Sequence, residues 1–136
     1  MGIEPYLVSS SVLAVLAQRL VRKVCSSCAL ERELTGNERE QLGLATAAES
    51  SLRYRAGPGC PACRNTGYRG RVAICELLRV DESIRRHIQS RASATEIRDA
   101  AIKGGMRHLR EDGIEKVLAG ITTPAEVARV TVRSET

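Results

Sequence analysis

Apolar side chains in the first part of the chain recur at helical spacing. Over residues 5–17, Pro5 stands near the start, and apolar residues cover much of a helical surface: Leu7, Val8, Val12, Leu13, Val15 and Leu16. This pattern predicts a mostly buried helix. Over residues 18–24 the apolar spacing changes and fits either a last helical turn or a short strand. We favour the strand.

The middle of the chain alternates between cap signals and strand patterns. Thr35 with Glu38 three residues later predicts a capping box, and Gly43 predicts the end of that short helix. From Arg53 the pattern indicates strands on either side of the glycine-rich residues 57–59, the second over residues 68–78.

Everything after Asp81 has a helical pattern. We expect Asp81 to cap a helix to about Gln89, and Ser93 with Glu96 to open a helix ending at residues 104–105. A third helix is predicted over residues 106–118 and closed by Gly120. Thr123 should cap a last helix over residues 124–130, and residues 133–136 are expected to fray.

Charge and composition narrow the classes of function. The 136 residues carry 21 basic and 16 acidic side chains, giving a net charge of +5, and there is no Trp or Phe. The charges are interspersed and no aromatic platform accompanies them, so nucleic acid is not expected as a partner. Attraction to an anionic lipid or an acidic partner stays open. Residues 6–24 contain too many polar side chains to span a bilayer.

Two CxxC pairs are the strongest chemical signal. Cys25 with Cys28 and Cys60 with Cys63 are separated by 31 residues. Each pair can bind one metal ion from a tight turn. Four thiolate ligands favour a closed, tetrahedral, structural zinc site with no open position for catalysis. Arg22, Lys23 and Arg64 stand beside these ligands and would offset the negative charge of the site. Disulfides, a redox-active pair and an iron–sulfur cluster are the alternatives.

No catalytic constellation accompanies the cysteines. Cys75 lies within an apolar strand pattern and is expected to pack as a small hydrophobe, while His87 and His108 fall on charged helical faces. No segment reads GxxxxGK[ST], so the chain lacks a nucleotide-binding loop. Gly67 and Gly70 precede a strand rather than a helix, which predicts a turn there.

Several segments together resemble the C-terminal region of the type II secretion and type IV pilus assembly ATPases, the protein E type of secretion motor. They are residues 2–6, 10–11, 16–22, the two CxxC pairs, 66–71, 76–78 and 106–130. In the last of these, residues at the family's positions are Asp112, Gly113, Lys116, Gly120, Thr122, Glu126 and Val127.

The resemblance implies an α/β fragment with three parts. Residues 1–24 would be the trailing helix and strand of a RecA-like ATPase core, residues 25–80 a tetracysteine zinc subdomain with its following strand, and residues 81–136 a small helical C-terminal subdomain. It also implies a cytoplasmic hexamer, peripheral to the inner membrane, that works with platform proteins there. ATP and magnesium would bind only in the full-length family, because Walker A and Walker B are absent from this sequence.

Two functions of different classes follow. The first is a structural and interaction role in a secretion motor, without ATP turnover by this chain alone. Arg19 and Arg22 could face a nucleotide cleft or a neighbouring protomer there, although a plain structural role is favoured. The second is a free-standing zinc-ribbon-like module that binds nucleic acid, against which the helix between the CxxC pairs and the dispersed basic residues count.

Overall fold

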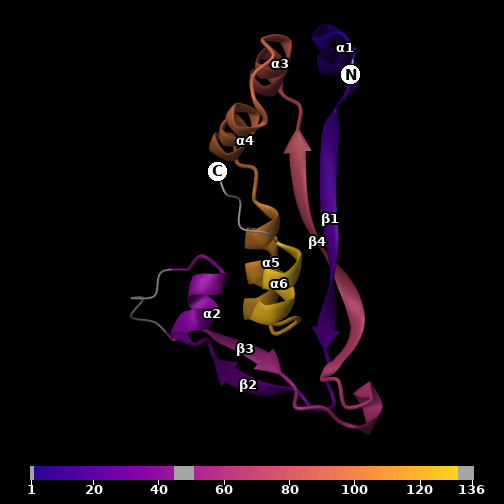
Figure 1. The fold of residues 1–136 in the computed structure, drawn as a ribbon, viewed down its shortest axis with the longest axis vertical. Helices are drawn as coiled ribbons and strands as arrows, with labels where there is room; N and C mark the ends of the chain where they lie inside the picture. Colours follow the sequence, from indigo (N-terminus) through magenta and orange to yellow (C-terminus); the bar gives the residue numbers. More distant parts are fainter. Residues whose placement is uncertain (1, 45–50, 132–136) are drawn as a thin grey trace. The chain divides into compact units, whose positions relative to one another are not determined.

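The computed structural model describes residues 2–44 and 51–131 (Figure 1). Its elements in chain order are α1 (Pro5–Ser11), β1 (Ala14–Val24), β2 (Leu30–Glu33), α2 (Gly36–Gln41), β3 (Arg53–Ala56), the 3₁₀-helix η1 (Pro61–Cys63), β4 (Tyr68–Arg79), α3 (Glu82–Gln89), α4 (Ala94–Lys103), α5 (Leu109–Leu118) and α6 (Pro124–Val130). The expected fraying of residues 133–136 lies outside the described residues.

The chain forms two compact units. Of the described residues, one unit holds 2–17 together with 75–108, and the other holds 18–44, 51–74 and 109–131. β1 and β4 pair as a two-stranded sheet, and each strand contributes residues to both units. The domain boundaries expected after residues 24 and 80 stay a prediction.

The helix predicted over residues 5–17 is wrong beyond Ser11. Val12 already has extended backbone angles (φ −88°, ψ 123°), and β1 begins at Ala14. The carbonyl of Leu13 accepts a hydrogen bond of 3.0 Å from the backbone N–H of Val80. Sheet pairing therefore overrides the local helical pattern in this stretch, and the strand favoured for residues 18–24 is the end of a longer one.

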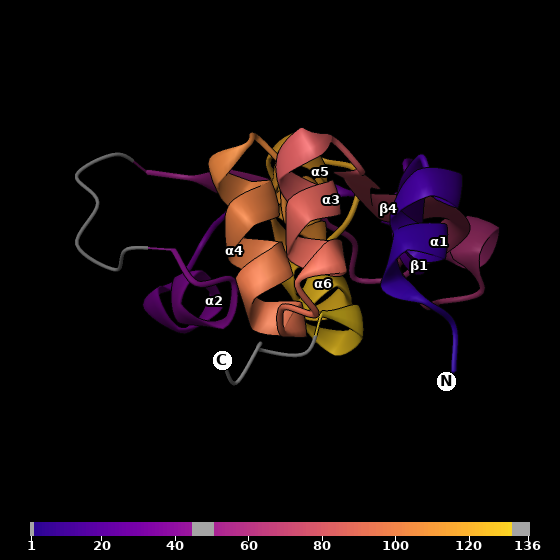
Figure 2. The ribbon, with the colours of Figure 1, turned by 90° about the horizontal axis from the view of Figure 1, so that it is seen from above.

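The first unit is held together by α1, α3 and α4. Asp81 caps α3 as predicted, since its carboxylate accepts a hydrogen bond of 2.9 Å from the Ile84 N–H. The α3 and α4 helices lie side by side (Figure 2), and their buried apolar cluster contains Val80, Ile84 and Ala101. The Arg85 side chain donates a 3.1 Å hydrogen bond to the Ser9 carbonyl and so ties α1 to α3.

The second unit has a core between a small sheet and three helices. β2 and β3 pair antiparallel, with Leu30 opposite Ala56 and Glu33 opposite Arg53. β2 was not predicted, because a four-residue strand with one apolar residue carries no recognisable alternation. The buried apolar side chains of this core, contributed by β3, α5, α6 and the chain around α2, are Leu34, Leu42, Tyr54, Val117 and Val127.

Caps fix the ends of the helices in this unit. The capping box of Thr35 and Glu38 is confirmed at the start of α2. Gly120, with φ of +79°, ends α5, and hydrogen bonds from Gly120 to Val117 and from Ile121 to Lys116 satisfy the last carbonyls of the helix. α5 starts at Leu109 rather than at residue 106. In the described part of the chain, every helix is too short or too polar to cross a membrane.

Candidate metal centre

Two short turns of the second unit bring the four predicted cysteines together. Cys25 directly follows β1, and the turn to Cys28 is closed by a 3.0 Å hydrogen bond from the Ala29 N–H to the Cys25 carbonyl. Cys60 directly precedes η1 and Cys63 is its last residue, and Pro61 occupies the first helical position. All four Sγ atoms lie within 4.8 Å of one another.

The distances between the sulfur atoms suit a tetrahedral ion. The Sγ atoms of Cys25 and Cys60 are 3.8 Å apart, those of Cys28 and Cys63 are 3.9 Å apart, and those of Cys60 and Cys63 are 3.7 Å apart. A regular tetrahedron with metal–sulfur bonds of about 2.3 Å places its ligands about 3.8 Å from one another. A disulfide needs about 2.05 Å between its sulfur atoms. The four side chains could therefore hold one metal ion without rearrangement.

Backbone N–H groups stabilise negative charge on Cys63. The N–H groups of Cys60 and Gly67 each donate a hydrogen bond of 3.2 Å to the Cys63 sulfur. Burial alone would raise the pKa of this thiol, but these hydrogen bonds lower the pKa to about 6. Burial raises the pKa of Cys28 instead, to about 11. A thiolate at Cys63 is thus available to a cation at neutral pH, and the charge of a bound cation would favour ionisation of the others.

Glycines leave room for the sulfur atoms. A Cβ atom on Gly57 would collide with the Sγ of Cys28, and one on Gly67 would collide with the carbonyl oxygen of Gly57. Gly67 also has φ of +81°, which a side chain would strain. The sequence predicts the turn at Gly67 but not the role of Gly57, because close approach to a sulfur atom leaves no signal in a single sequence.

Replacing Gly57 by alanine is expected to displace Cys28 and destabilise the centre by about 1–3 kcal/mol, as overpacking does. Its φ does not lie in the left-handed region, so the collision rather than backbone strain is the expected cause. The control is Gly36→Ala, where nothing lies within 4 Å of the added atom. Thermal unfolding and metal content measure both variants. Equal unfolding midpoints for Gly57→Ala and Gly36→Ala would contradict this reading of the close contact.

A charged network lies in the same unit, and the sequence did not predict it. The Glu126 carboxylate, 2% exposed, accepts hydrogen bonds from the backbone N–H of Arg22 (2.8 Å), from its guanidinium (2.8 and 3.0 Å) and from that of Arg129 (2.9 Å). Burial alone would raise the pKa of Glu126, but these hydrogen bonds lower it to about 2. The Thr122 hydroxyl donates to the Arg22 carbonyl at 2.7 Å. The network thus fixes α6 against the strand that leads into Cys25.

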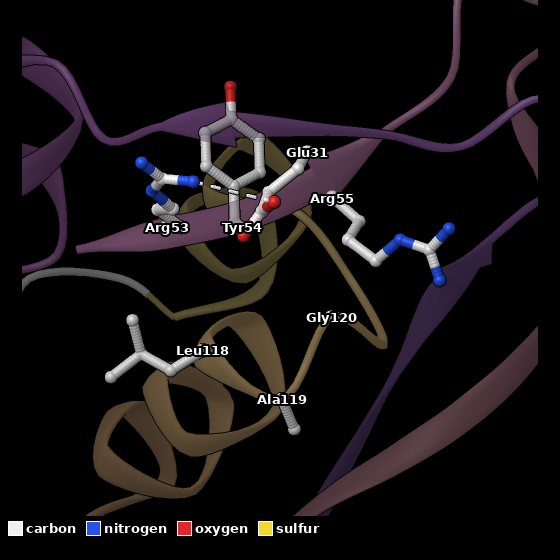
Figure 3. Close-up of a pocket in the computed structure, with 7 residues that line it drawn as sticks. All are labelled: Glu31, Arg53, Tyr54, Arg55, Leu118, Ala119 and Gly120. Atoms are coloured by element: carbon white, nitrogen blue, oxygen red, sulfur yellow. Dashed lines mark ion pairs between the residues drawn. The ribbon is translucent and has the colours of Figure 1, made fainter.

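A hollow of about 390 Å³ lies in this unit between the β2–β3 sheet and the end of α5 (Figure 3). Its lining residues are Glu31, Arg53, Tyr54, Arg55, Leu118, Ala119 and Gly120. The Arg53 and Glu31 side chains form an ion pair of 3.5 Å across its edge, and both are more than half exposed. Such an exposed ion pair contributes little to stability. None of the four cysteines lines the hollow.

The remaining candidate residues stay apart from the centre. Cys75 is partly buried in β4 and is not one of the clustered cysteines. The His87 ring lies 2.7 Å from the Ser83 carbonyl of its own helix, and the His108 ring lies 3.9 Å from the Glu76 carboxylate. Among the described residues, the four cysteines are the one group of at least three potential ligands close enough to share an ion.

The chain is similar to known secretion and pilus assembly proteins over nearly its whole length. The profile of the family described as "Type II/IV secretion system protein" matches residues 1–129. The type IV pilus assembly ATPase PilB of Thermus thermophilus is 47% identical over 132 residues, which is 97% of this chain and 15% of that protein. Type II secretion system protein E of Aeromonas hydrophila is 47% identical over 96% of this chain and 26% of its own length. Type II secretion system ATPase E of Vibrio cholerae is 45% identical over 98% of this chain and 26% of its own length.

Proposed function

Because the chain belongs to the type II/IV secretion system protein family, we propose that it is the C-terminal, zinc-stabilised part of an ATPase that powers type II protein secretion or type IV pilus assembly. In this role the parent protein is a cytoplasmic hexamer, peripheral to the inner membrane, that acts with membrane platform proteins. This chain contributes structure and contacts. Nucleotide hydrolysis belongs to segments that contain Walker A and Walker B.

The distances between the four sulfur atoms support the proposal that the bound metal is zinc. Four cysteines with sulfur separations of 3.7 to 3.9 Å match a tetrahedral thiolate site, and four sulfur ligands without nitrogen or oxygen favour zinc over hard cations. Zinc would supply a closed, redox-inert cross-link between the two turns. The first turn follows β1 and the second precedes β4, so the cross-link would fix the ends of both strands.

The exposed side chains of β1 support the placement beside an ATPase core. The residues on and just before this strand include four large apolar side chains that are at least half exposed: Leu13, Val15, Leu16 and Leu20. A two-stranded sheet is marginal by itself, and apolar strands of this kind are normally covered. In the proposal, β1 and α1 are the trailing strand and helix of a RecA-like core whose further chain covers these residues.

Elemental analysis and an ATPase assay test the proposal together. We expect one zinc ion per chain in protein purified without added metal, and we expect this chain alone to show no ATP turnover above buffer. A second preparation joins it to an upstream segment with the Walker motifs, and there turnover should appear. Absence of zinc with four reactive thiols, or turnover by the isolated chain, would refute the respective part of the proposal.

A further inference from the structure

Basic residues gather around the cysteine centre without acidic neighbours in sequence. We define the basic arm as residues 22–28 and 57–71, the two segments that hold the four cysteines. These segments contain no Asp or Glu, and their basic residues are Arg22, Lys23, Arg64, Arg69 and Arg71. In the rest of the chain, acidic and basic residues are interspersed. The arm is thus a local concentration of positive charge in a chain whose net charge is only +5.

Four of these five side chains have no acidic partner among the residues that the structure describes. Arg22 pairs with Glu126, whereas no ion pair reaches Lys23, Arg64, Arg69 or Arg71. All five residues are exposed. A charge that folding leaves unpaired and hydrated is available to a ligand of opposite sign.

Lys23 lies next to the strand segment that carries Arg69 and Arg71. A Cβ atom on Gly70 would lie 3.8 Å from the Lys23 side chain, so Lys23 extends across β4 at the residue between Arg69 and Arg71. Arg64 lies just after η1 in a left-handed conformation, with φ of 56°. The arm occupies the end of the β1–β4 sheet where both cysteine turns lie (Figure 1).

The side chains of the arm favour carboxylates over a bilayer or nucleic acid. Four of the five basic residues are arginines, whose planar guanidinium binds carboxylates with two parallel hydrogen bonds. None of the large exposed apolar side chains of the described residues lies in the arm, so it has no anchor to insert into lipid. Its one aromatic ring, Tyr68, is covered by the Arg22 guanidinium at 4.1 Å, and its hydroxyl is bonded to Thr123 at 2.8 Å. The ring face under the guanidinium is thus not free to stack on a base.

We propose that the basic arm is a docking surface for an acidic segment of a partner protein. The inference goes beyond the role in secretion proposed above and does not depend on the identity of the metal. Recognition would come from arginine–carboxylate pairs at the rim of the metal centre. It should weaken with salt, because the pairs are exposed.

Fluorescence anisotropy with a labelled twelve-residue peptide of alternating Glu and Ser tests this on the full chain. We expect binding at low salt that weakens at physiological salt, and the triple variant Arg64→Asn, Arg69→Ser, Arg71→Ser to lose about tenfold in affinity, or roughly 0.5 kcal/mol for each exposed pair. Asparagine is chosen at position 64 because it tolerates the left-handed conformation. The control Arg79→Ser, Arg86→Ser, Lys103→Ser removes the same charge from exposed sites outside the arm, and it should change affinity less than about twofold.

Three results would overturn the proposal. They are no binding of the peptide by the unmodified chain, equal weakening in both triple variants, and tighter binding to phosphatidylglycerol vesicles or duplex DNA that the arm variant alone loses. The last would assign the surface to a lipid or a nucleic acid. Circular dichroism and metal content verify that each variant is folded. If the triple variant is not, the single exposed substitution Arg71→Glu should reproduce the loss, and unchanged affinity there would also refute the docking surface.

Discussion

Replacing Cys60 by serine is expected to abolish metal binding and to unfold the unit built around the four cysteines. The Cys60 sulfur lies 3.8 Å from that of Cys25 and 3.7 Å from that of Cys63, so its loss removes one corner of the tetrahedron. Metal-binding free energy in small zinc modules is about 10–16 kcal/mol and acts as folding free energy. This is as large as the whole free energy of unfolding of an ordinary domain, about 5–15 kcal/mol, so losing it is expected to unfold the unit.

The control for this variant is Cys75→Ser. Cys75 is only partly buried and stands outside the cluster, so the same chemical change should leave the metal content intact and cost at most about 2 kcal/mol. Metal analysis and thermal unfolding are measured on both. The unmodified chain must contain one metal ion for this comparison. If Cys60→Ser then unfolds at the same temperature as the unmodified chain, the centre does not hold this unit together.

Replacing Glu126 by glutamine is expected to destabilise the second unit by about 2–4 kcal/mol at pH 7. The carboxylate is buried, and it accepts hydrogen bonds from the backbone and side chain of Arg22 and from Arg129. Glutamine keeps the shape but removes the charge and turns one acceptor into a donor. The control is Glu31→Gln, which breaks an exposed pair with Arg53 and should cost less than about 1 kcal/mol.

The Glu126 contribution should also depend on pH. Its folded-state pKa, about 2, lies below the unfolded value of about 4.3. The carboxylate therefore stabilises the fold fully above the unfolded pKa, and this stabilisation is lost as pH falls towards 2. Denaturant unfolding at several pH values should show a constant difference between the unmodified chain and Glu126→Gln above about pH 5.5, narrowing below it. A difference that widens on acidification would contradict the assigned pKa shift.

Local signals predicted the helices after residue 80 and the grouping of the cysteines. Asp81, Thr35 and Thr123 cap their helices as predicted, because a cap depends on residues three positions away. CxxC spacing is equally local, and two such pairs imply a common ligand. These features need no knowledge of distant contacts.

The features that the sequence did not reveal depend on distant partners. Residues 13–16 are all apolar, so their pattern fits a helix as well as a strand. They form a strand because β1 pairs with β4. β2 exists because β3 lies opposite it. The bonds between Arg22 and Glu126 join residues 104 positions apart, and neither residue differs in sequence from an ordinary surface charge. Tertiary contact overrides or creates each of these features.

The separation between Arg22 and Glu126 has a consequence for the order of events during synthesis. The cysteine turns are complete once residue 67 has left the ribosome, since Gly67 supplies the last backbone hydrogen bond to Cys63. Glu126 and Thr122, which close the network on Arg22, emerge more than fifty residues later. At about 5–20 residues per second, seconds pass between the emergence of the cysteine turns and the emergence of the α6 residues that contact β1. The metal would then act as the early fixed point onto which the rest of the unit assembles.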